Sequence, residues 1–472
     1  MSGDRGGDRG TVVLVGAGLG GALLSILLGR SGFRVRGYEM RPDPRKGPSA
    51  GSRSINLALS ARGLHALQQV GLADAVLARA VPMRGRMIHD VRGATAFQPY
   101  GTEAGHVNQS VSRSELNAIL LDAAEREPNV RFAFGRKCTE VDLETGTTRF
   151  EATVSDAATP DAATPAGATG APAAPDTARG EEVRGDVVLG ADGAFSMVRR
   201  QMMRIDRFDY RQDYLSHGYK ELTVPPAPGG GFLMEAKALH IWPRGGFMMI
   251  ALPNRDGSFT CTLFWPHDGP NSFAALRTEA DVAAFFRSEF PDAVPLMPDL
   301  AQQYLANPIG SLVTIRCRPW HLRGRVGILG DAAHAVVPFH GQGANCAFED
   351  CLALDASARR HAPDWERALT EFEAGRKENA DALAALSLDN FVEMRDHTAS
   401  RMFRARKAIE KTLYRLFPAS FMPLYMMISF SRIPYAETIR RARRQTRRLR
   451  TAAGAAGFLA LFLLLFWLAR GR

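Results

Sequence analysis

The chain has 472 residues, of which 46% are apolar and 23% charged, so it can bury two or three hydrophobic cores and is not disordered as a whole. Its net charge of +10 suggests a nucleic-acid-binding protein until the charge is located. Residues 440–450 hold seven arginines and no acid, and Arg470 and Arg472 add two more, which leaves the first 439 residues near +1. The basic charge is local to the tail, and no nucleic-acid groove is predicted.

The first predicted element is a strand at residues 11–15, whose β-branched and aliphatic run is typical of a strand buried in a parallel sheet. A G-x-G-x-x-G pattern, a helix-forming stretch and a second strand at 33–38 follow, and that strand ends at Glu39. Such glycines allow a tight turn against a pyrophosphate at a helix N-terminus, and the acid accepts hydrogen bonds from ribose hydroxyls. The pattern predicts a dinucleotide-binding unit on Gly16, Gly18, Gly21 and Glu39.

Two later segments repeat a buried-type strand that ends in Gly-Asp. Residues 187–194 carry Asp192, and residues 326–331 carry Asp331, where a carboxylate can meet the hydroxyls of a ribityl chain. A loop with Gly341 and Gly343 then leads into a helix near Asn345, and such loops offer bare N–H groups to an electron-rich ligand. Each segment alone is also compatible with an ordinary turn. Their order along the chain favours one nucleotide cofactor site.

The middle of the chain predicts a second domain and one insert. Runs of β-forming residues at 208–222, 239–252 and 258–264, broken by Pro and Gly turns, predict an antiparallel sheet, and 281–290 reads as a short helix. Residues 155–180 contain no apolar side chain larger than Ala except proline, which predicts a disordered insert. It interrupts a hairpin expected between 149–151 and 182–183.

The five cysteines show no C-x-x-C spacing, so we expect packing residues in a reducing compartment, with neither a disulfide framework nor a metal site. Residues 1–10 are polar and Gly-rich, and no signal peptide is predicted before the first strand.

The C-terminal tail predicts a membrane-associating helix. Residues 452–469 carry no charge, and eighteen helical residues reach about 27 Å, close to the roughly 30 Å of a hydrocarbon core. The seven arginines before them would keep the N-terminal side of the segment in the cytoplasm, and Trp467 suits the far interface. Spanning the membrane, lying on it with arginines on lipid phosphates, and docking on the protein all stay open.

These elements predict an α/β fold that combines a Rossmann-like dinucleotide-binding domain, a second domain built on an antiparallel sheet, a C-terminal helical region and a hydrophobic tail helix. The predicted division is 11–80, 104–200 and 310–365 for the cofactor domain, 81–103 and 201–309 for the substrate domain, 366–439 for the helical region, and 440–472 for the basic tail.

The three nucleotide motifs in this order resemble those of the flavoprotein aromatic hydroxylases, which carry FAD in one Rossmann-like domain. Longer segments resemble the kynurenine 3-monooxygenase family, over a range from about 11 to 439 without the insert. The tail fits as well, since eukaryotic members are membrane-anchored at the C-terminus. The matching segments are RSINLALS at 53–60, MIHD at 87–90, HGYKEL at 217–222, HIWPR at 240–244, FMMIALPN at 247–254 and SFTCTLF at 258–264.

The resemblance implies an NADPH-dependent enzyme that converts L-kynurenine to 3-hydroxykynurenine with O2 through a flavin C4a-hydroperoxide, in tryptophan degradation and NAD biosynthesis. NADPH would bind transiently, because no second G-x-G-x-x-G follows a strand. A related hydroxylase of another aromatic amino-carboxylate and a non-catalytic, membrane-tethered flavoprotein are the alternatives.

The resemblance also implies site residues. For the substrate carboxylate these are Arg86, Tyr100, Asn390 and Tyr425, with Arg84 as a neighbour that the sequence does not exclude. An arginine offers a carboxylate a planar two-donor fork, to which tyrosine adds a neutral donor. The flavin face would be lined by Pro338, Phe339, His340, Gly341, Gln342 and Gly343, with no acid–base catalyst assigned, and Arg53 and Arg113 would be further flavin contacts.

Overall fold

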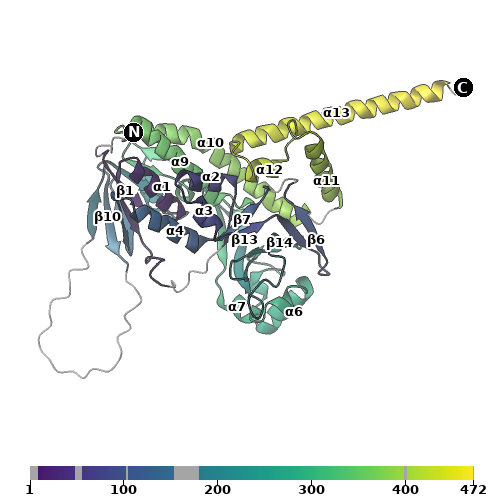
Figure 1. Cartoon of the computed structure of the whole chain (residues 1–472), viewed down its shortest axis with the longest axis horizontal. Coiled ribbons are helices and arrows are strands. Elements are labelled where there is room, and N and C mark those ends of the chain that lie inside the picture. The colour runs from purple at the N-terminus through teal and green to yellow at the C-terminus, as the bar shows by residue number, and fades with distance from the viewer. Residues whose placement is uncertain (1–8, 48–55, 102–104, 154–179, 398–400, 471–472) are drawn as a thin grey trace, which may run out of the picture.

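The computed structural model describes residues 9–47, 56–101, 105–153, 180–397 and 401–470 (Figure 1). The apolar run near the N-terminus forms β1 (Thr11–Val15), which lies inside a six-stranded sheet of order β18-β19-β12-β1-β2-β8. It pairs in parallel with β2 (Arg34–Glu39) and β12 (Val187–Gly190), and β12 pairs in parallel with β19 (Val326–Ile328). Parallel strands share one carboxyl edge, so the motifs that follow β1, β2, β12 and β19 are brought to the same edge of the sheet.

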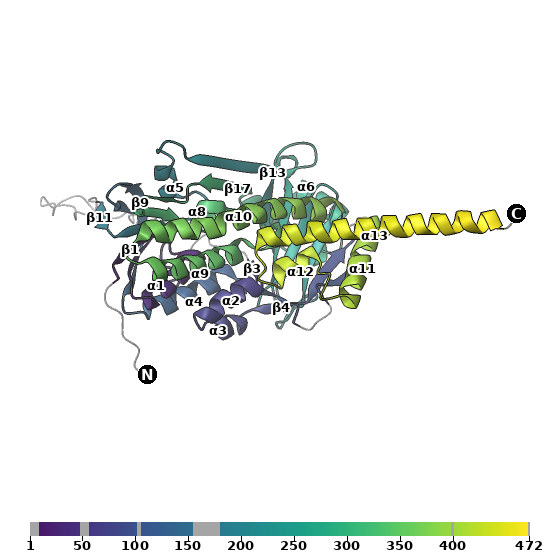
Figure 2. The same ribbon diagram turned by 90° about the horizontal axis from the view of Figure 1, so that it is seen from above.

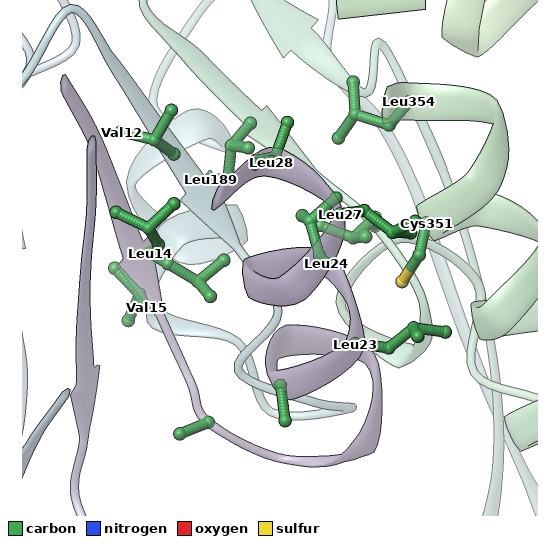
Figure 3. Close-up of a cluster of buried hydrophobic side chains, with 14 of the residues drawn as sticks. Val12, Leu14, Val15, Leu23, Leu24, Leu27, Leu28, Leu189, Cys351 and Leu354 are labelled. Atoms are coloured by element: carbon green, nitrogen blue, oxygen red, sulfur yellow. The ribbon is translucent and has the colours of Figure 1, made fainter. Parts of the chain in front are cut away.

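Helix α1 (Leu19–Arg30) is buried on almost every side, which explains why its sequence has no polar face. It lies between the sheet and α9 (Gly343–His361), so that Leu24 and Leu28 contact a core shared with Leu14 and Leu354 (Figure 3). All five cysteines are buried and free, as the predicted packing role requires.

A second sheet has the order β17-β13-β16-β15-β14-β5-β6. Its pairs are antiparallel, as predicted, except that β5 runs parallel to β14 because it arrives from a separate part of the chain. Helices α6 (Glu279–Glu289) and α7 (Leu300–Ala306) cover the face of this sheet that carries Trp242 and Leu263 (Figure 1), and α6 begins with a Thr278–Asp281 capping box. The strands are β5 (Gly85–His89), β6 (Thr95–Pro99), β13 (Asp209–Val224), β14 (Ala238–Pro243), β15 (Met248–Pro253), β16 (Phe259–Pro266) and β17 (Gly310–Arg318).

Two strand pairs connect segments that are distant in the sequence or belong to different predicted domains. Strand β17 pairs with β13 in the second sheet, and β4 (Val81–Met83) pairs with β7 (Asn108–Ser112) in a separate three-stranded sheet. The interrupted hairpin is confirmed, since β10 (Thr147–Ala152) and β11 (Glu181–Arg184) pair antiparallel with Arg149 opposite Glu182. The insert between them, 154–179, falls outside the described residues.

The C-terminal helical region is interrupted at Pro418, Pro423 and Pro434, each of which lies outside a helix. Helix α10 (Trp365–Val392) runs beside α9 and continues as a π-helix, Glu393–His397 (Figure 2). After α11 (Arg401–Leu416) and α12 (Leu424–Ser429), α13 (Tyr435–Arg470) extends away from the body of the molecule (Figures 1 and 2).

Within the part of the chain that the structure describes, no helix combines the length and apolarity needed to cross a membrane. The predicted tail at 452–469 belongs to α13, and for most of its residues the structure describes the backbone only.

The remaining elements are β3 (Asn56–Leu59), α2 (Ala61–Gln69), α3 (Ala73–Leu77), α4 (Arg113–Glu125), β8 (Val130–Phe134), β9 (Arg136–Val141), α5 (Met197–Met202), α7 (Leu300–Ala306), β18 (His321–Leu322), α8 (Asp331–His334) and the 3-10 turns Phe273–Ala275, Val294–Leu296 and Pro338–His340.

Candidate active site

The glycines of the N-terminal motif differ in what a side chain at each position would contact. Gly16 has φ +98°, and a Cβ on Gly21 would come within 2.0 Å of the Gly16 carbonyl oxygen, so the turn itself demands both glycines. A Cβ on Gly18 would meet no protein atom within 4 Å. Nothing in the protein requires glycine there, whereas a pyrophosphate at the N-terminus of α1 does. The motif therefore fits a dinucleotide.

Glu39, at the end of β2, is held beside this turn. Its Oε2 accepts a hydrogen bond of 2.9 Å from the Ala17 N–H, and its Oε1 accepts one of 3.0 Å from the Arg41 N–H. These two bonds fix the carboxylate where the ribose of a nucleotide on α1 would lie.

Asp192 uses only one of its carboxylate oxygens within the protein. Oδ2 accepts hydrogen bonds from the Met197 N–H (2.7 Å) and the Val198 N–H (3.2 Å) at the start of α5. Oδ1 is buried and has no hydrogen-bond partner among the described residues. A buried carboxylate oxygen without a donor is costly, so a hydroxyl or N–H of a bound cofactor fits this position.

Asp331 begins α8 and is exposed, with the Arg113 guanidinium close enough to interact with its carboxylate electrostatically. Asp331 was predicted as a cofactor contact from its Gly-Asp motif and Arg113 from the family resemblance, and the fold brings the two residues close enough to interact. Arg53, predicted with them, lies outside the described residues.

The loop after α8 is held by side chains that were predicted to bind cofactor. Asn345 is fully buried, and its Oδ1 accepts hydrogen bonds from the Ser60 and Gly63 N–H groups (3.0 and 3.1 Å) while its Nδ2 donates to the Ala58 and Gly341 carbonyls (3.0 and 2.9 Å). With these four bonds its amide is saturated, so any cofactor contact at Asn345 comes from its backbone.

Gln342 is buried in the same way. Its Oε1 accepts hydrogen bonds from the Ser60 hydroxyl (3.2 Å) and the Tyr435 hydroxyl (3.1 Å). Gly341 has φ +63°, and α9 begins at Gly343, so the N–H groups of the first turn of α9 have no partner within the helix and are available to a ligand. Side chains below the loop shape it, and its backbone is what it offers to a ligand.

Strand alternation brings Arg86 to an apolar surface. Along β5, Arg86 and Ile88 lie on one face, and their parallel partners on β14 are Leu239 and Ile241. This face belongs to a hydrophobic cluster that also includes Phe339 of the loop. The full cluster is Ile88, Leu215, Tyr219, Leu239, Ile241, Met248, Ile250, Phe264, Leu312, Val337, Phe339, Leu388, Phe391 and Met394.

Two tyrosines surround the Arg86 guanidinium. Its Cζ lies 4.6 Å from the centre of the Tyr425 ring, which stacks on Tyr100 with 5.3 Å between ring centres. Asn108 Nδ2 donates to the Tyr425 hydroxyl at 2.9 Å. Arg86 Nε is buried and has no hydrogen-bond partner among the described residues, so the cation keeps a donor for a ligand.

The charges of this group are set by burial and by neighbours. Burial lowers the pKa of Arg86, but Tyr425, Tyr100 and Glu393 outweigh that effect and raise the pKa above its usual value. Burial, reinforced by Tyr425, raises the pKa of Tyr100 well above its usual value. Arg86 therefore stays cationic and Tyr100 stays a neutral hydroxyl donor at neutral pH.

Asn390 reaches the same place from α10. Its Nδ2 donates to the Phe339 carbonyl at 2.7 Å and contacts Met394 Sδ at 3.2 Å, which leaves its oxygen to accept from a ligand. The predicted set Arg86, Tyr100, Asn390 and Tyr425 is thus drawn together around the loop. Arg84, by contrast, is exposed and contacts Tyr100 through its backbone carbonyl.

Sequence reasoning missed Asn108 and Glu393, which support the tyrosines and the cation. Asn108 lies in the ordinary polar strand β7 and Glu393 at a helix end, and neither position carries a short motif. A π-helix begins at Glu393, and π-helical turns are frequent at functional sites. This signal is visible only in the structure.

One group of possible metal ligands, His334, Cys346 and Asp350, lies below the loop with ligand atoms within 4.8 Å of one another. Arg376 already occupies it, because its Nε donates to Asp350 Oδ1 at 2.7 Å and its Nη2 to Cys346 Sγ at 3.2 Å. A guanidinium in this place repels a metal cation, and we assign no metal there.

Comparison with known proteins agrees with a cofactor site of this kind. A family model described as an FAD binding domain matches residues 9–357, and the chain is therefore an FAD-binding flavoprotein. Solved structures share the fold: a 2-methyl-3-hydroxypyridine-5-carboxylic acid oxygenase matches with a TM-score of 0.63 and 20% identity over 89% of this chain and 95% of that one. Pseudomonas aeruginosa PqsL in complex with 2-aminobenzoylacetate matches with a TM-score of 0.62 and 21% identity over 83% and 97%.

More similar proteins show to which family of FAD-binding proteins the chain belongs. A kynurenine 3-monooxygenase of Myxococcus xanthus is 50% identical over 90% of this chain and 87% of its own length. Those of Salinispora arenicola (47%; 96% and 95%) and Dictyostelium discoideum (43%; 90% and 89%) are similar to it over comparable shares. The chain belongs to the kynurenine 3-monooxygenase family and is a flavoprotein monooxygenase.

Gly18→Ala is expected to weaken FAD binding at least about tenfold without destabilising the apoprotein, since a methyl group there meets cofactor rather than protein. Gly20→Ala is the matched control, because Gly20 lies in the first turn of α1 and its Cβ would lie at an ordinary 3.8 Å from Ala347 Cβ of α9. Titration of the apoproteins with FAD and their thermal unfolding measure both effects. Equal FAD affinity for Gly18→Ala and the unchanged protein would contradict this account of the turn.

Proposed function

We propose that the protein hydroxylates L-kynurenine at the 3-position of its ring, using FAD, NADPH and O2. Membership of the family supports this activity, and the observation that carries the substrate assignment is the half-buried Arg86 guanidinium beside an apolar cluster. L-Kynurenine has matching parts, since its carboxylate needs a cation and its aminophenyl ring needs an apolar surface.

The residues around Arg86 suggest how the substrate is held. Arg86 would bind the carboxylate with Tyr100 and Tyr425, while the oxygen of Asn390 would accept from the substrate ammonium group. The ring would lie against Phe339 and its apolar neighbours. Ligand contact there also removes water, which raises the strength of the charge pair.

The cofactor would lie along the carboxyl edge of the first sheet. FAD, when bound, supplies hydride acceptance from NADPH and the activation of O2. The residues proposed to hold it are Gly16, Gly18, Gly21, Glu39, Arg53, Arg113, Asp192, Asp331, Gly341, Gln342, Gly343 and Asn345, the last two and Gln342 through their backbone.

The chain need not supply a strong base. The aniline nitrogen of kynurenine already makes the adjacent ring carbon electron-rich, so the protein's part is positioning and exclusion of water. His340 lies 6.4 Å from Tyr425 between ring centres, and we assign it no proton transfer.

The function is tested by turnover with purified, FAD-loaded protein. L-Kynurenine is expected to stimulate NADPH oxidation and to yield close to one 3-hydroxykynurenine per NADPH, with little H2O2. Other aromatic amino-carboxylates serve as the comparison panel. Coupled hydroxylation of one of them in place of kynurenine would identify a related hydroxylase, and absence of any turnover would favour a non-catalytic flavoprotein.

Arg86→Ala is expected to raise the KM for L-kynurenine at least about tenfold, because it removes charge-assisted hydrogen bonds to the carboxylate. Its FAD content stays normal, since the cofactor residues are elsewhere. Arg84→Ala is the control two residues away and leaves KM near its original value, as Arg84 is exposed. The reverse order of the two effects, or loss of FAD from Arg86→Ala, would show that the carboxylate binds elsewhere.

We also propose that the C-terminal tail associates with lipid and keeps the catalytic part at the cytoplasmic surface of a membrane. Support comes from the arginine-rich first half of α13 and from the uncharged segment 452–469 that follows. Arg441, Arg444 and Arg448 line one hollow of about 320 Å³ together with Phe421 and Met422, a mixed basic and apolar surface that suits anionic headgroups.

Truncation after Arg450 tests this without disturbing the folded part, because Tyr435 and Thr438 at the start of α13 are fully buried and must be kept. The full-length chain is expected to float with vesicles containing anionic lipid, and the truncated chain to bind them far more weakly and to keep its kynurenine turnover. Equal flotation of the two proteins would mean that the uncharged segment 452–469 does not contribute to lipid binding.

A further inference from the structure

Arg62 is a buried cation that the site described so far does not use. It lies in the first turn of α2 and is 1% exposed. A cation at this position faces the positive end of its own helix dipole, and burying it costs free energy unless other groups compensate. Its partners therefore show what the position is for.

Three of those partners are backbone carbonyls, two in α12 and one between α12 and α13. Arg62 Nε donates to the Ile428 carbonyl at 3.0 Å, and Nη2 donates to the carbonyls of Met427 and Ile433. Met427 and Ile428 lie in the last turn of α12, whose carbonyls have no partner within the helix. Arg62 thus caps the C-terminus of α12 from another part of the chain, where a cation also suits the helix dipole.

Two more contacts fix Arg62 itself. Its Nη1 donates to Glu349 Oε1 of α9 at 2.7 Å, and its guanidinium stacks 4.0 Å from the centre of the fully buried Tyr435 ring. The Tyr435 hydroxyl in turn donates to Gln342, in the loop proposed to face the flavin. One side chain therefore joins α2, α9 and the start of α13 to α12.

Helix α12 is only six residues long and carries Tyr425 one turn before Ile428. A helix this short is not stable by itself, so the place of Tyr425 depends on what holds the helix ends. The Tyr425 ring stacks on Tyr100 and lies over Arg86, and a shift of α12 would displace it from both.

We propose that Arg62 is a positioning residue for the substrate site: by capping α12 it holds Tyr425 against Arg86 and Tyr100. This inference rests on the proposed function, because it assigns Tyr425 to the substrate carboxylate. Arg62 has no direct contact with Arg86 or Tyr100 among the described residues, so its effect on substrate passes through α12.

Arg62→Lys keeps the charge and the Glu349 partner but loses the fork that spans three carbonyls. We expect the KM for L-kynurenine to rise at least about tenfold with normal FAD content, and hydrogen exchange of the backbone amides of residues 424–430 to quicken. The matched control is Arg376→Lys, since Arg376 also pairs with Glu349 at 3.2 Å and is buried, but caps no carbonyl of α12. It is expected to leave that exchange and that KM unchanged.

A double-mutant cycle separates positioning from general destabilisation. If Arg62 acts through Tyr425, the KM of Arg62→Lys/Tyr425→Phe stays near that of the single variant with the higher KM. It does not reach the product of the two separate rises in KM. Multiplicative effects, or unchanged exchange in α12, would overturn the proposal. Should Arg62→Lys not fold, Glu349→Gln gives the same test with a smaller expected rise.

Hydrogen exchange in the FAD-loaded protein needs no turnover, so it reports on the capping of α12 by Arg62 even if another substrate replaces kynurenine. If the unchanged protein hydroxylates kynurenine but Arg62→Lys leaves hydrogen exchange in α12 as it was, only the role of Arg62 is rejected. If Arg62→Lys quickens exchange in α12 but the unchanged protein does not turn over kynurenine, only the proposed function is rejected.

Discussion

The site is organised around a cation held at the edge of an apolar cluster. A guanidinium that loses water must regain polar partners, and Arg86 finds them in two tyrosine rings and in the field of Glu393. Arg86 itself lies on β5, and these partners come from the segment after β6, from the π-helix that follows α10 and from α12. The protein must therefore bring four distant pieces of chain to one place, and much of its architecture serves that end.

The cofactor end of the site obeys a different constraint. Parallel strands deliver their following turns to one edge, so Gly16, Glu39, Asp192 and Asp331 meet without long side chains having to reach. The unpaired Asp192 oxygen and the open surface above Gly18 are the marks of a ligand in this arrangement. At the other end the apolar cluster around Phe339 links the loop to the second sheet. Asn390 ties that loop to α10, so the residues proposed to bind the cofactor and those proposed to bind the substrate are directly connected.

How much the sequence predicted depends on the range of the interactions. The buried strands β1, β12 and β19 are readable because strands covered on both faces are apolar throughout, and the helix breaks at proline are readable because proline removes a local donor. The pairing of β5 with β14 and of β17 with β13 was not predictable, since it depends on side chains from separate parts of the chain. The proposed roles of Arg86 and Tyr425 came from the likeness to a known family, since composition and spacing alone give these two residues no signal.

Side-chain roles were the hardest to predict. Asn345 was expected to touch cofactor, yet its amide is fully used in holding Ser60, Gly63, Ala58 and Gly341. Arg62 gave no signal at all, because the sequence of α2 reads as an amphipathic surface helix while its carbonyl partners lie near the far end of the chain. Such contacts between distant segments decide function here, and they become visible only once the chain is folded.

The most direct test is a crystal structure of the FAD-loaded protein with L-kynurenine. The account predicts the substrate carboxylate at about 2.7–3.2 Å from the guanidinium of Arg86 and the hydroxyls of Tyr100 and Tyr425, with the ring against Phe339. A carboxylate bound at Arg84, or a kynurenine ring away from this cluster, would contradict it.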